Sequence, residues 1–325
     1  MFSIEAIALH KNYLPKDSGR FAGLGSHDVS GTSNITFSVE PGELFGIIGP
    51  DGAGKTTLFR ILTTLLLADS GTARVDGYDV VSEFKAIRQR IGYMPGRFSL
   101  YQDLTVEENL TFFATLFNTT IQANYDLIKD IYQQIEPFKH RKAGQLSGGM
   151  KQKLALSCAL IHKPTVLFLD EPTTGVDAVS RTEFWDMLGN LKKQGITILV
   201  STPYMDEAAL CDRISLIQEG RFLTINTPTG IVDQYKETLW AVRGERTSRL
   251  LAELRKKEGV TSCFAFGDSL HVTLDPTITH RDRLFGELAK ADSSTLSIEP
   301  ITPTIEDCFL QLSRQHTPAS WNTSL

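Results

Sequence analysis

The chain has 325 residues, a length that predicts about two domains at roughly 150 residues each. Hydrophobic residues make up 41% and charged residues 22%, which is ordinary for a globular protein and excludes collagen-like, coiled-coil and disordered classes. The 33 Lys and Arg against 38 Asp and Glu give a net charge of −5, which argues against nucleic acid as a partner because such proteins present a basic face.

The N-terminal residues lack the basic and apolar regions of a signal peptide, and the longest apolar stretches are only as long as a strand. A membrane-spanning helix needs about 20 apolar residues. The cysteines are scattered without a C-x-x-C pair, so neither a disulfide framework nor a zinc site is predicted. We therefore expect a protein of the reducing cytosol that does not itself cross a membrane.

From about Ile4 to Phe222, short apolar strands alternate with helical patterns, which predicts an α/β domain with a largely parallel sheet. The clearest strands are 44–48, 166–169 and 196–200, and a helix is predicted over 55–66. A further helix begins at a capping box of Thr105 and Glu108. Its apolar stripe is more typical of core than of function; the stripe consists of Val106, Leu110, Phe113 and Phe117.

The composition changes after the turn at 219–220, and a second domain follows. Its predicted order is strand, helix, strand, strand, helix, strand, as in ferredoxin-like units. The predicted ranges are 239–242, 248–257, 263–266, 270–274, 281–290 and 295–298, followed by a last helix that begins near Thr304 and a polar tail from His316.

The strongest motif is GPDGAGKTT at 49–57, which satisfies G-x-x-x-x-G-K-[ST] between a predicted strand and a predicted helix. Glycines let backbone N–H groups close around phosphates, Lys55 would reach the β and γ oxygens, and the Thr56 hydroxyl would ligate Mg²⁺. The alternative is a glycine-rich turn with no ligand. The predicted phosphate-binding residues are Gly49, Pro50, Asp51, Gly52, Ala53, Gly54, Lys55, Thr56 and Thr57.

A second motif is the apolar strand that ends in Asp170-Glu171. A strand tip is where a phosphate-loop fold places a carboxylate near Mg²⁺, so Asp170 is the predicted metal-directed residue. Glu171 is the predicted catalytic residue, a general base that polarises an attacking water. The alternative is an ordinary acidic loop.

A third motif, Ser147-Gly148-Gly149, opens a helix and decides the family. Together with GPDGAGKTT upstream and LFLDEPTTGVD downstream, it closely resembles the nucleotide-binding subunit of an ATP-binding cassette (ABC) transporter. The run PTIEDCFL at 303–310 resembles the C-terminal extension of cassettes that serve drug and polysaccharide exporters.

The resemblance implies an ABC cassette at 1–235, with a mostly parallel core sheet, an antiparallel β subdomain and a helical signature subdomain. A small ferredoxin-like α+β domain at 236–315 and a flexible tail at 316–325 would follow. Tyr13 would stack on adenine, although a plain surface tyrosine is the alternative. Ser147, Gly148 and Gly149 of one subunit would complete the ATP site of a second cassette.

The resemblance also implies an ATPase, with ATP and Mg²⁺ as cofactors, that drives export through separately encoded transmembrane permease subunits. It would lie on the cytoplasmic face of the inner membrane as a peripheral protein, in a homodimer or heterodimer of cassettes. The non-transport alternative is an ABC ATPase or regulatory module that uses ATP-driven dimerisation for another purpose.

Two positions depart from the family pattern. Gly96 stands where the family usually has glutamine, and Pro203 stands where it has a histidine that bonds the γ-phosphate. Losing one such donor typically costs about 10²- to 10³-fold in rate. One hypothesis is a degenerate site whose intact Ser147-Gly148-Gly149 serves a partner cassette; the other is a homodimer that hydrolyses ATP through Glu171.

Overall fold

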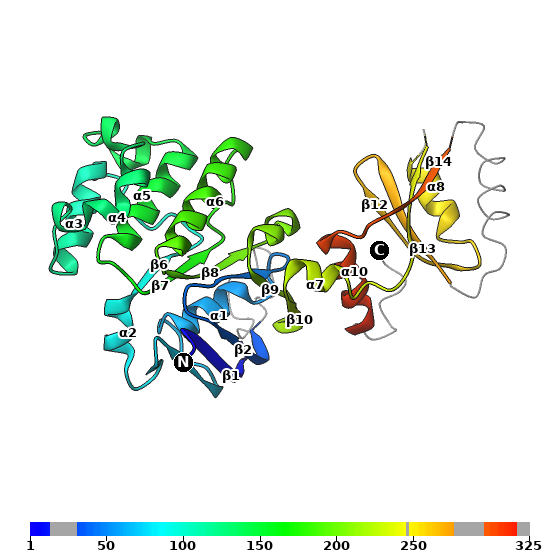
Figure 1. Cartoon of the computed structure of the whole chain (residues 1–325), viewed down its shortest axis with the longest axis horizontal. Helices are drawn as coiled ribbons and strands as arrows, with labels where there is room; N and C mark the ends of the chain where they lie inside the picture. The colour runs from blue at the N-terminus through cyan, green and yellow to red at the C-terminus, as the bar shows by residue number, and fades with distance from the viewer. Residues whose placement is uncertain (14–30, 245–246, 276–295, 317–325) are drawn as a thin grey trace, which may run out of the picture. The chain divides into compact units, whose positions relative to one another are not determined.

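The structure, a computed structural model, describes residues 1–13, 31–244, 247–275 and 296–316. The chain divides into two compact units, Met1–Pro228 and Thr229–Leu325 (Figure 1). Within the described residues, no helix is both long and apolar enough to cross a bilayer.

The first unit is built on a six-stranded sheet in the order β10-β9-β3-β8-β7-β6. All neighbouring pairs are parallel except β9 and β10, which confirms the largely parallel sheet expected from the sequence. Every residue of the central strands β3, β7 and β8 is buried, as their unbroken apolar runs require. The strands are β3 (Leu44–Ile48), β6 (Ile91–Met94), β7 (Val166–Asp170), β8 (Thr197–Thr202), β9 (Arg213–Gln218) and β10 (Arg221–Asn226).

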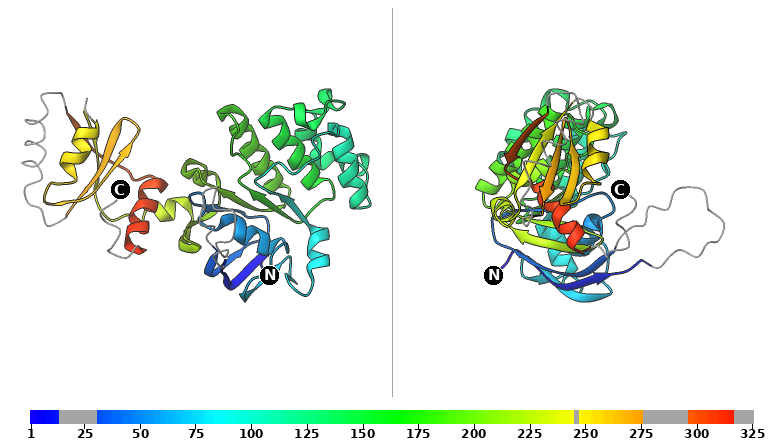
Figure 2. Two further views of the ribbon diagram at one scale, coloured as in Figure 1. Left: turned by 180° about the vertical axis from the view of Figure 1, so that it is seen from behind. Right: turned by 90° about the vertical axis from the view of Figure 1, so that its right-hand side faces the viewer.

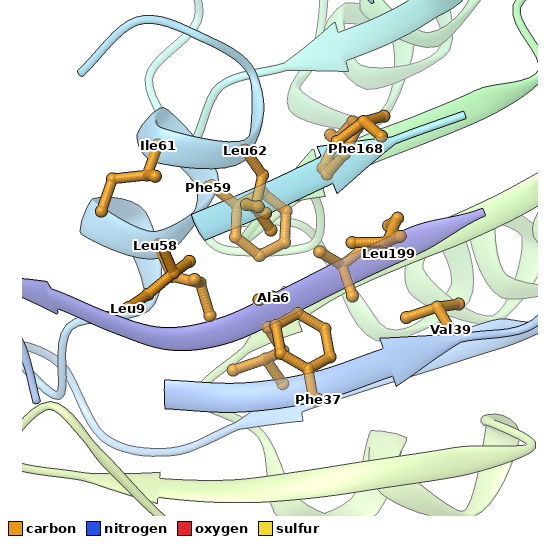
Figure 3. Close-up of a cluster of buried hydrophobic side chains, with 14 of the residues drawn as sticks. Ala6, Leu9, Phe37, Val39, Leu58, Phe59, Ile61, Leu62, Phe168 and Leu199 are labelled. Carbon is orange, nitrogen blue, oxygen red and sulfur yellow. The ribbon is translucent and has the colours of Figure 1, made fainter. Parts of the chain in front are cut away.

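An antiparallel sheet in the order β2-β1-β4-β5 forms a second layer of this unit. Its strands are β1 (Ile4–Lys11), β2 (Thr32–Val39), β4 (Ser70–Val75) and β5 (Tyr78–Asp79). Helix α1 (Lys55–Leu62) shares one core with both sheets, and Figure 3 shows its apolar side chains among those of the strands. The Phe59 ring meets the Phe168 ring edge-on at 6.0 Å between centroids. This packing fixes the start of α1, where the glycine-rich loop ends.

Helix α1 ends at Leu62, so its predicted extension to residue 66 is wrong. Thr64 has φ of +65°, a left-handed conformation that terminates helices. The amides of Leu65 and Leu66 fold back to the carbonyl of Arg60 at 2.8 and 3.0 Å. The continuing run of leucines gave no sign of this stop.

Helices α3, α4 and α5 gather at the side of the first unit away from β1 and β2 (Figure 1). The capping box that begins α3 is confirmed, with Glu108 and Thr105 exchanging hydrogen bonds. The helices of this unit are α2 (Phe84–Arg90), α3 (Val106–Leu116), α4 (Tyr125–Tyr132), α5 (Gly148–Leu160) and α6 (Ala178–Lys193), and the 3₁₀ turns are η1 (Gln122–Asn124), η2 (Glu136–Phe138), η3 (Ala143–Gln145) and η4 (Met205–Leu210).

The apolar stripe predicted as core on α3 is only partly core. Val106 and Leu110 are fully buried, but Phe113 and Phe117 are half-buried and line a groove beside α5. The helix turns this end of its stripe towards an open surface, which periodicity alone does not distinguish from an interior.

The second unit is a four-stranded antiparallel sheet in the order β12-β13-β11-β14. Because β13 lies between β11 and β12, the β11-α8-β12 segment is a split β-α-β unit, as in ferredoxin-like folds. Figure 2 shows α8 along one face of this sheet, where Leu250 and Leu254 enter its core. The elements are β11 (Leu239–Arg243), α8 (Thr247–Leu254), β12 (Val260–Phe266), β13 (Ser269–Leu274), β14 (Ser297–Ile301) and α10 (Ile305–His316), with α7 (Pro228–Val232) at the boundary of the two units.

Two predicted features of this part lie outside the described residues. They are the helix expected over 281–290 and the tail after His316. The first predicted strand and the hairpin that follows α8 agree with the structure within a few residues, and the last helix begins at Ile305 as its capping signal indicated.

Candidate functional site

The glycine-rich loop 49–57 connects the carboxyl end of β3 to α1. Gly54 has φ of +101° at the N-cap of α1, a conformation that favours glycine. At Gly49, an added Cβ would lie only 2.2 Å from the carbonyl oxygen of Ile217 on β9. The loop therefore starts in close contact with β9 and ends at a helix N-terminus, which favours an anion.

Lys55 folds over this loop and is 3% exposed. Its Nζ donates to the carbonyl oxygens of Gly49 and Pro50 at 2.8 and 3.0 Å, and it pairs with the Glu171 carboxylate at 3.0 Å. A buried ammonium group needs such partners. The structure thus brings the predicted phosphate-binding lysine and the predicted general base into contact.

Asp170 ends β7 with 1% exposure. Burial raises its pKa and so does the charge of Glu171, while hydrogen bonds from Ser201 and Thr56 act in the opposite direction. The Ser201 hydroxyl donates to Asp170 Oδ1 at 2.7 Å. A divalent cation would stabilise the ionised carboxylate, and oxygen ligands of this kind suit Mg²⁺, so Asp170 and Thr56 fit the metal that the sequence predicted.

Glu171 has φ of +51°, which is a strained conformation for a residue with a side chain. Its amide donates to the carbonyl and hydroxyl oxygens of Ser201 at 3.1 and 3.0 Å. Strain of this kind persists only where neighbouring contacts over-determine it, and it is frequent at functional sites. Ser201 therefore anchors both acidic residues, a role that its place at a strand end did not reveal in the sequence.

The Ser147-Gly148-Gly149 motif begins α5. The Ser147 hydroxyl caps the helix by accepting from the Met150 amide at 3.3 Å. A Cβ at Gly149 would lie 2.6 Å from Ser180 Oγ on α6, so glycine permits this close packing. Ser147 and Gly148 are exposed. The contacts described for this motif are with α6 and the loop before it, and not with the loop 49–57.

Tyr13 shares a hydrogen bond with the Thr57 hydroxyl at 3.3 Å, and the tyrosine is 38% exposed. The residue therefore lies beside the phosphate-loop end of α1, with part of its ring open to solvent.

The two departures from the family pattern lie at the same edge of the sheet. A Cβ at Gly96 would be 3.0 Å from the Asp170 carbonyl oxygen and 3.8 Å from Glu171 Cβ. Pro203 directly follows Thr202, whose carbonyl accepts from the Gly49 amide at 3.2 Å. Gly96 therefore adjoins the two acidic residues, and Pro203 adjoins the glycine-rich loop.

A buried carboxylate that the sequence analysis missed lies behind this edge. Glu207 in η4 is 2% exposed. It accepts from the Thr173 hydroxyl at 2.8 Å and from the Thr202 hydroxyl, and its distance to Arg181 Nε is 3.2 Å. Nothing in the local sequence distinguished it from the exposed Asp206 beside it.

An apolar groove of about 770 Å³ runs between α2, β6, α3 and α5. Phenylalanines line it, and Gly96 contributes to its wall near the acidic residues. Lys85 and Arg88 add positive charge to its lining. The aromatic residues are Phe84, Tyr93, Phe98, Phe113 and Phe117.

Comparison with known sequences agrees with this geometry. The family described as ABC transporter matches residues 32–174. A probable multidrug ABC transporter ATP-binding protein, YbhF of Escherichia coli, is 38% identical over 298 residues, which are 90% of this chain and 50% of that protein. The chain thus spans about half the length of this relative.

Two further relatives are also ATP-binding proteins. Nod factor export ATP-binding protein I of Burkholderia lata is 41% identical over 204 residues, covering 62% of this chain and 67% of that protein. The doxorubicin resistance ATP-binding protein DrrA of Mycobacterium tuberculosis is 38% identical over 206 residues, covering 62% of each.

Solved structures share the fold. The cassette cbiO1 of Clostridium perfringens, part of an ABC transporter complex, has a TM-score of 0.60 at 25% identity and covers 72% of this chain and 91% of that chain. An ATP-binding cassette solved as a dimer with ADP and phosphate has a TM-score of 0.59 at 23% identity and covers 69% of this chain and 98% of that chain.

Proposed function

The chain belongs to the ABC transporter family of ATP-binding proteins, and on this premise we propose that it is the subunit that couples MgATP binding and hydrolysis to export through separate membrane subunits. The observation that carries this proposal is the meeting of Lys55, Asp170 and Glu171 beside the glycine-rich loop. The names of three relatives support this proposal: one is a Nod factor export protein, one a probable multidrug transporter protein and one a doxorubicin resistance protein.

We assign the nucleotide to the loop 49–57, with the β and γ phosphates at the N-terminus of α1. Lys55 exchanges its loop carbonyl partners for phosphate oxygens, and Thr56 and Asp170 hold Mg²⁺. When bound, Mg²⁺ neutralises charge that develops on the phosphates. Glu171, released from Lys55, orients a water molecule and accepts its proton at a carboxylate oxygen. Tyr13, which shares a hydrogen bond with Thr57, is proposed to stack on the adenine.

Two cassettes are proposed to close around the nucleotide, and a structural relative solved as a dimer with ADP and phosphate supports a dimer. Ser147 and Gly148 are exposed at the start of α5, where amides and helix dipole favour an anion. In the proposed dimer they meet the phosphates held by Lys55 of the second cassette, together with Gly149.

The chain's own site is proposed to turn over slowly. Gly96 offers no side-chain amide and Pro203 offers no hydrogen-bond donor, although both lie at the site's edge. MgATP binding depends mainly on the loop, Lys55 and Thr56, which are all present. Binding should therefore survive better than hydrolysis, and the chain's Ser147-Gly148-Gly149 remains able to serve a partner cassette.

The apolar groove is proposed to receive a helical segment of a transmembrane subunit, which would hold this chain at the cytoplasmic face of the inner membrane. Three features of the groove support that occupant. Its lining is apolar and aromatic, and Lys85 and Arg88 would complement an acidic residue of the helical segment. Gly96 in its wall lies close to Asp170 and Glu171. A segment in the groove would thereby adjoin Asp170 and Glu171.

A matched pair of variants tests the groove. Phe84 lines it and is 36% exposed, whereas Phe112 is 40% exposed and lies outside its lining. Phe84→Asp should abolish recovery of this chain in membrane complexes with its permease, while Phe112→Asp should leave recovery intact. Equal recovery of both variants would refute this docking site.

The Glu171→Gln variant tests the ATPase itself. It should bind MgATP, lose nearly all hydrolysis and remain as an ATP-bound dimer in sedimentation experiments. Hydrolysis that persists in this variant would contradict the role given to Glu171. Co-purification of the wild-type chain with nucleic acid rather than with a membrane protein would favour the non-transport alternative.

A further inference from the structure

Glu207 contacts three segments around the end of the sheet where Asp170 and Glu171 lie. Thr173 lies two residues after Glu171, Thr202 ends β8 immediately before Pro203, and Arg181 lies in the first turn of α6. The two threonine hydroxyls donate to one carboxylate that is 2% exposed, and Arg181 forms an ion pair with it. A buried carboxylate with this many donors holds its neighbours more firmly than a surface ion pair does.

The backbone at Glu171 needs such support, because its φ of +51° is strained. On one side, Ser201 at the end of β8 holds the Glu171 amide. On the other side, Pro172 is followed by Thr173, whose hydroxyl donates to Glu207 at 2.8 Å. Glu171 is therefore held on both sides, by Ser201 of β8 and, through Thr173, by Glu207 in the turn that follows β8.

The same carboxylate also fixes the loop that follows. The Val176 amide donates to the Thr173 carbonyl at 3.2 Å, and Asp177 then caps α6. Since Arg181 binds Glu207 from the first turn of α6, both ends of the loop 173–177 are tied to one group. Resting on the ATPase function proposed above, we propose that Glu207 is a positioning residue that holds Glu171 and the loop 172–177 in their working geometry.

Amide hydrogen exchange and single-turnover hydrolysis by the full chain test this assignment. Glu207→Gln keeps the shape of the side chain but removes the charge and one acceptor. We expect faster exchange confined to residues 171–177, with residues 49–57 unchanged. We also expect hydrolysis to fall about 10²-fold, the size of effect that misplacement by about 1 Å produces, while the dissociation constant for MgATP changes less than hydrolysis.

The chain supplies a matched control and a second test. Asp206 also binds Arg181, at 2.9 Å, but its side chain is 74% exposed, so Asp206→Asn should change neither measurement. Thr173→Val removes the hydroxyl that reaches Glu207 and should reproduce the Gln variant, whereas Thr173→Ser should retain wild-type behaviour. This second pair decides the question even where Glu207→Gln folds poorly.

Unchanged exchange at 171–177 in both Glu207→Gln and Thr173→Val would overturn the proposal. So would faster exchange spread across the whole first unit, since that result means a purely structural role. Failure of the ATPase proposal looks different: the wild-type chain would neither bind nor hydrolyse MgATP, while the exchange experiment would still report whether Glu207 holds the loop.

Discussion

Restoring a histidine at Pro203 is the sharpest test of the slow-turnover proposal. The carbonyl of Thr202 accepts from the Gly49 amide at 3.2 Å, so residue 203 begins beside the phosphate loop. The Tyr204 amide bonds the Thr202 hydroxyl at 3.1 Å, and that hydroxyl also reaches Glu207. An imidazole introduced by Pro203→His would therefore project from a turn that is fixed on both sides.

The gain from one well-placed donor is about 10²- to 10³-fold in rate, or roughly 3 to 4 kcal/mol of barrier. Loss of the proline ring should lower the free energy of unfolding by only about 0.4 to 1 kcal/mol, through the greater freedom of the unfolded chain. Pro203→Ala has the same loss of stability but adds no side-chain hydrogen-bond donor. We expect Pro203→His to raise the hydrolysis rate by about two orders of magnitude and Pro203→Ala to leave it unchanged.

Gly96→Gln should help less by itself. Its Cβ would lie 3.0 Å from the Asp170 carbonyl oxygen, so the loop must shift by a small amount before the new amide can reach Mg²⁺ or water. Gly96→Ala measures the effect of that shift without an amide. Steady-state ATPase assays of each variant and of the double replacement, with MgATP binding measured in parallel, complete the series. A wild-type chain that already hydrolyses ATP briskly, with no gain in Pro203→His, would refute the reasoning.

Three other variants test separate parts of the site. Burial raises the pKa of Asp170 in the folded chain, so ionisation of this carboxyl lowers the stability of the fold as pH rises above the ordinary pKa of 3.8. Asp170→Asn should flatten this pH dependence in thermal unfolding without nucleotide. The same variant should abolish Mg²⁺-dependent hydrolysis. Gly49→Ala should lose MgATP binding and about 1 to 3 kcal/mol of stability in denaturant unfolding, because its Cβ would overlap the Ile217 carbonyl. Ser147→Ala should lose a helix cap worth about 1 kcal/mol and weaken ATP-driven dimerisation in sedimentation, with MgATP binding by the single chain retained.

Opposite results would contradict each of these assignments. They are an unaltered pH profile in Asp170→Asn, normal MgATP binding in Gly49→Ala, and undiminished dimerisation in Ser147→Ala.

The sequence predicted those parts of the site that are formed by residues next to one another in the chain. The loop 49–57 is such a case, because its glycines, its lysine and its flanking strand and helix are all contiguous. Strands buried on both faces, such as 44–48, were likewise evident from unbroken apolar runs. Helix stops set by backbone conformation, such as the left-handed Thr64, had no compositional signal.

Contacts between distant segments could not be predicted in this way. Ser201 and Asp170 are 31 residues apart and meet only because β7 and β8 are neighbours in the sheet. Glu207 and Thr173 are 34 residues apart, and no pattern in the sequence predicts their hydrogen bond. Likewise, Phe113 and Phe117 follow a core-like period but line an open groove. Burial and exposure along one helix face depend on what the rest of the chain places opposite it.

The ion pair between Lys55 and Glu171 makes the proposed general base a competitor of the nucleotide proposed to bind Lys55. One carboxylate oxygen of Glu171 lies 3.0 Å from the Lys55 ammonium group, to which the phosphates are proposed to bind. Under the proposed function, entry of ATP exchanges one anion for another at Lys55, and the released carboxylate becomes available to water at that moment. A Glu171→Gln variant removes the competitor as well as the base. We therefore expect retention of ATP by this variant to combine two effects, easier binding of phosphate by Lys55 and slower cleavage of the phosphate bond.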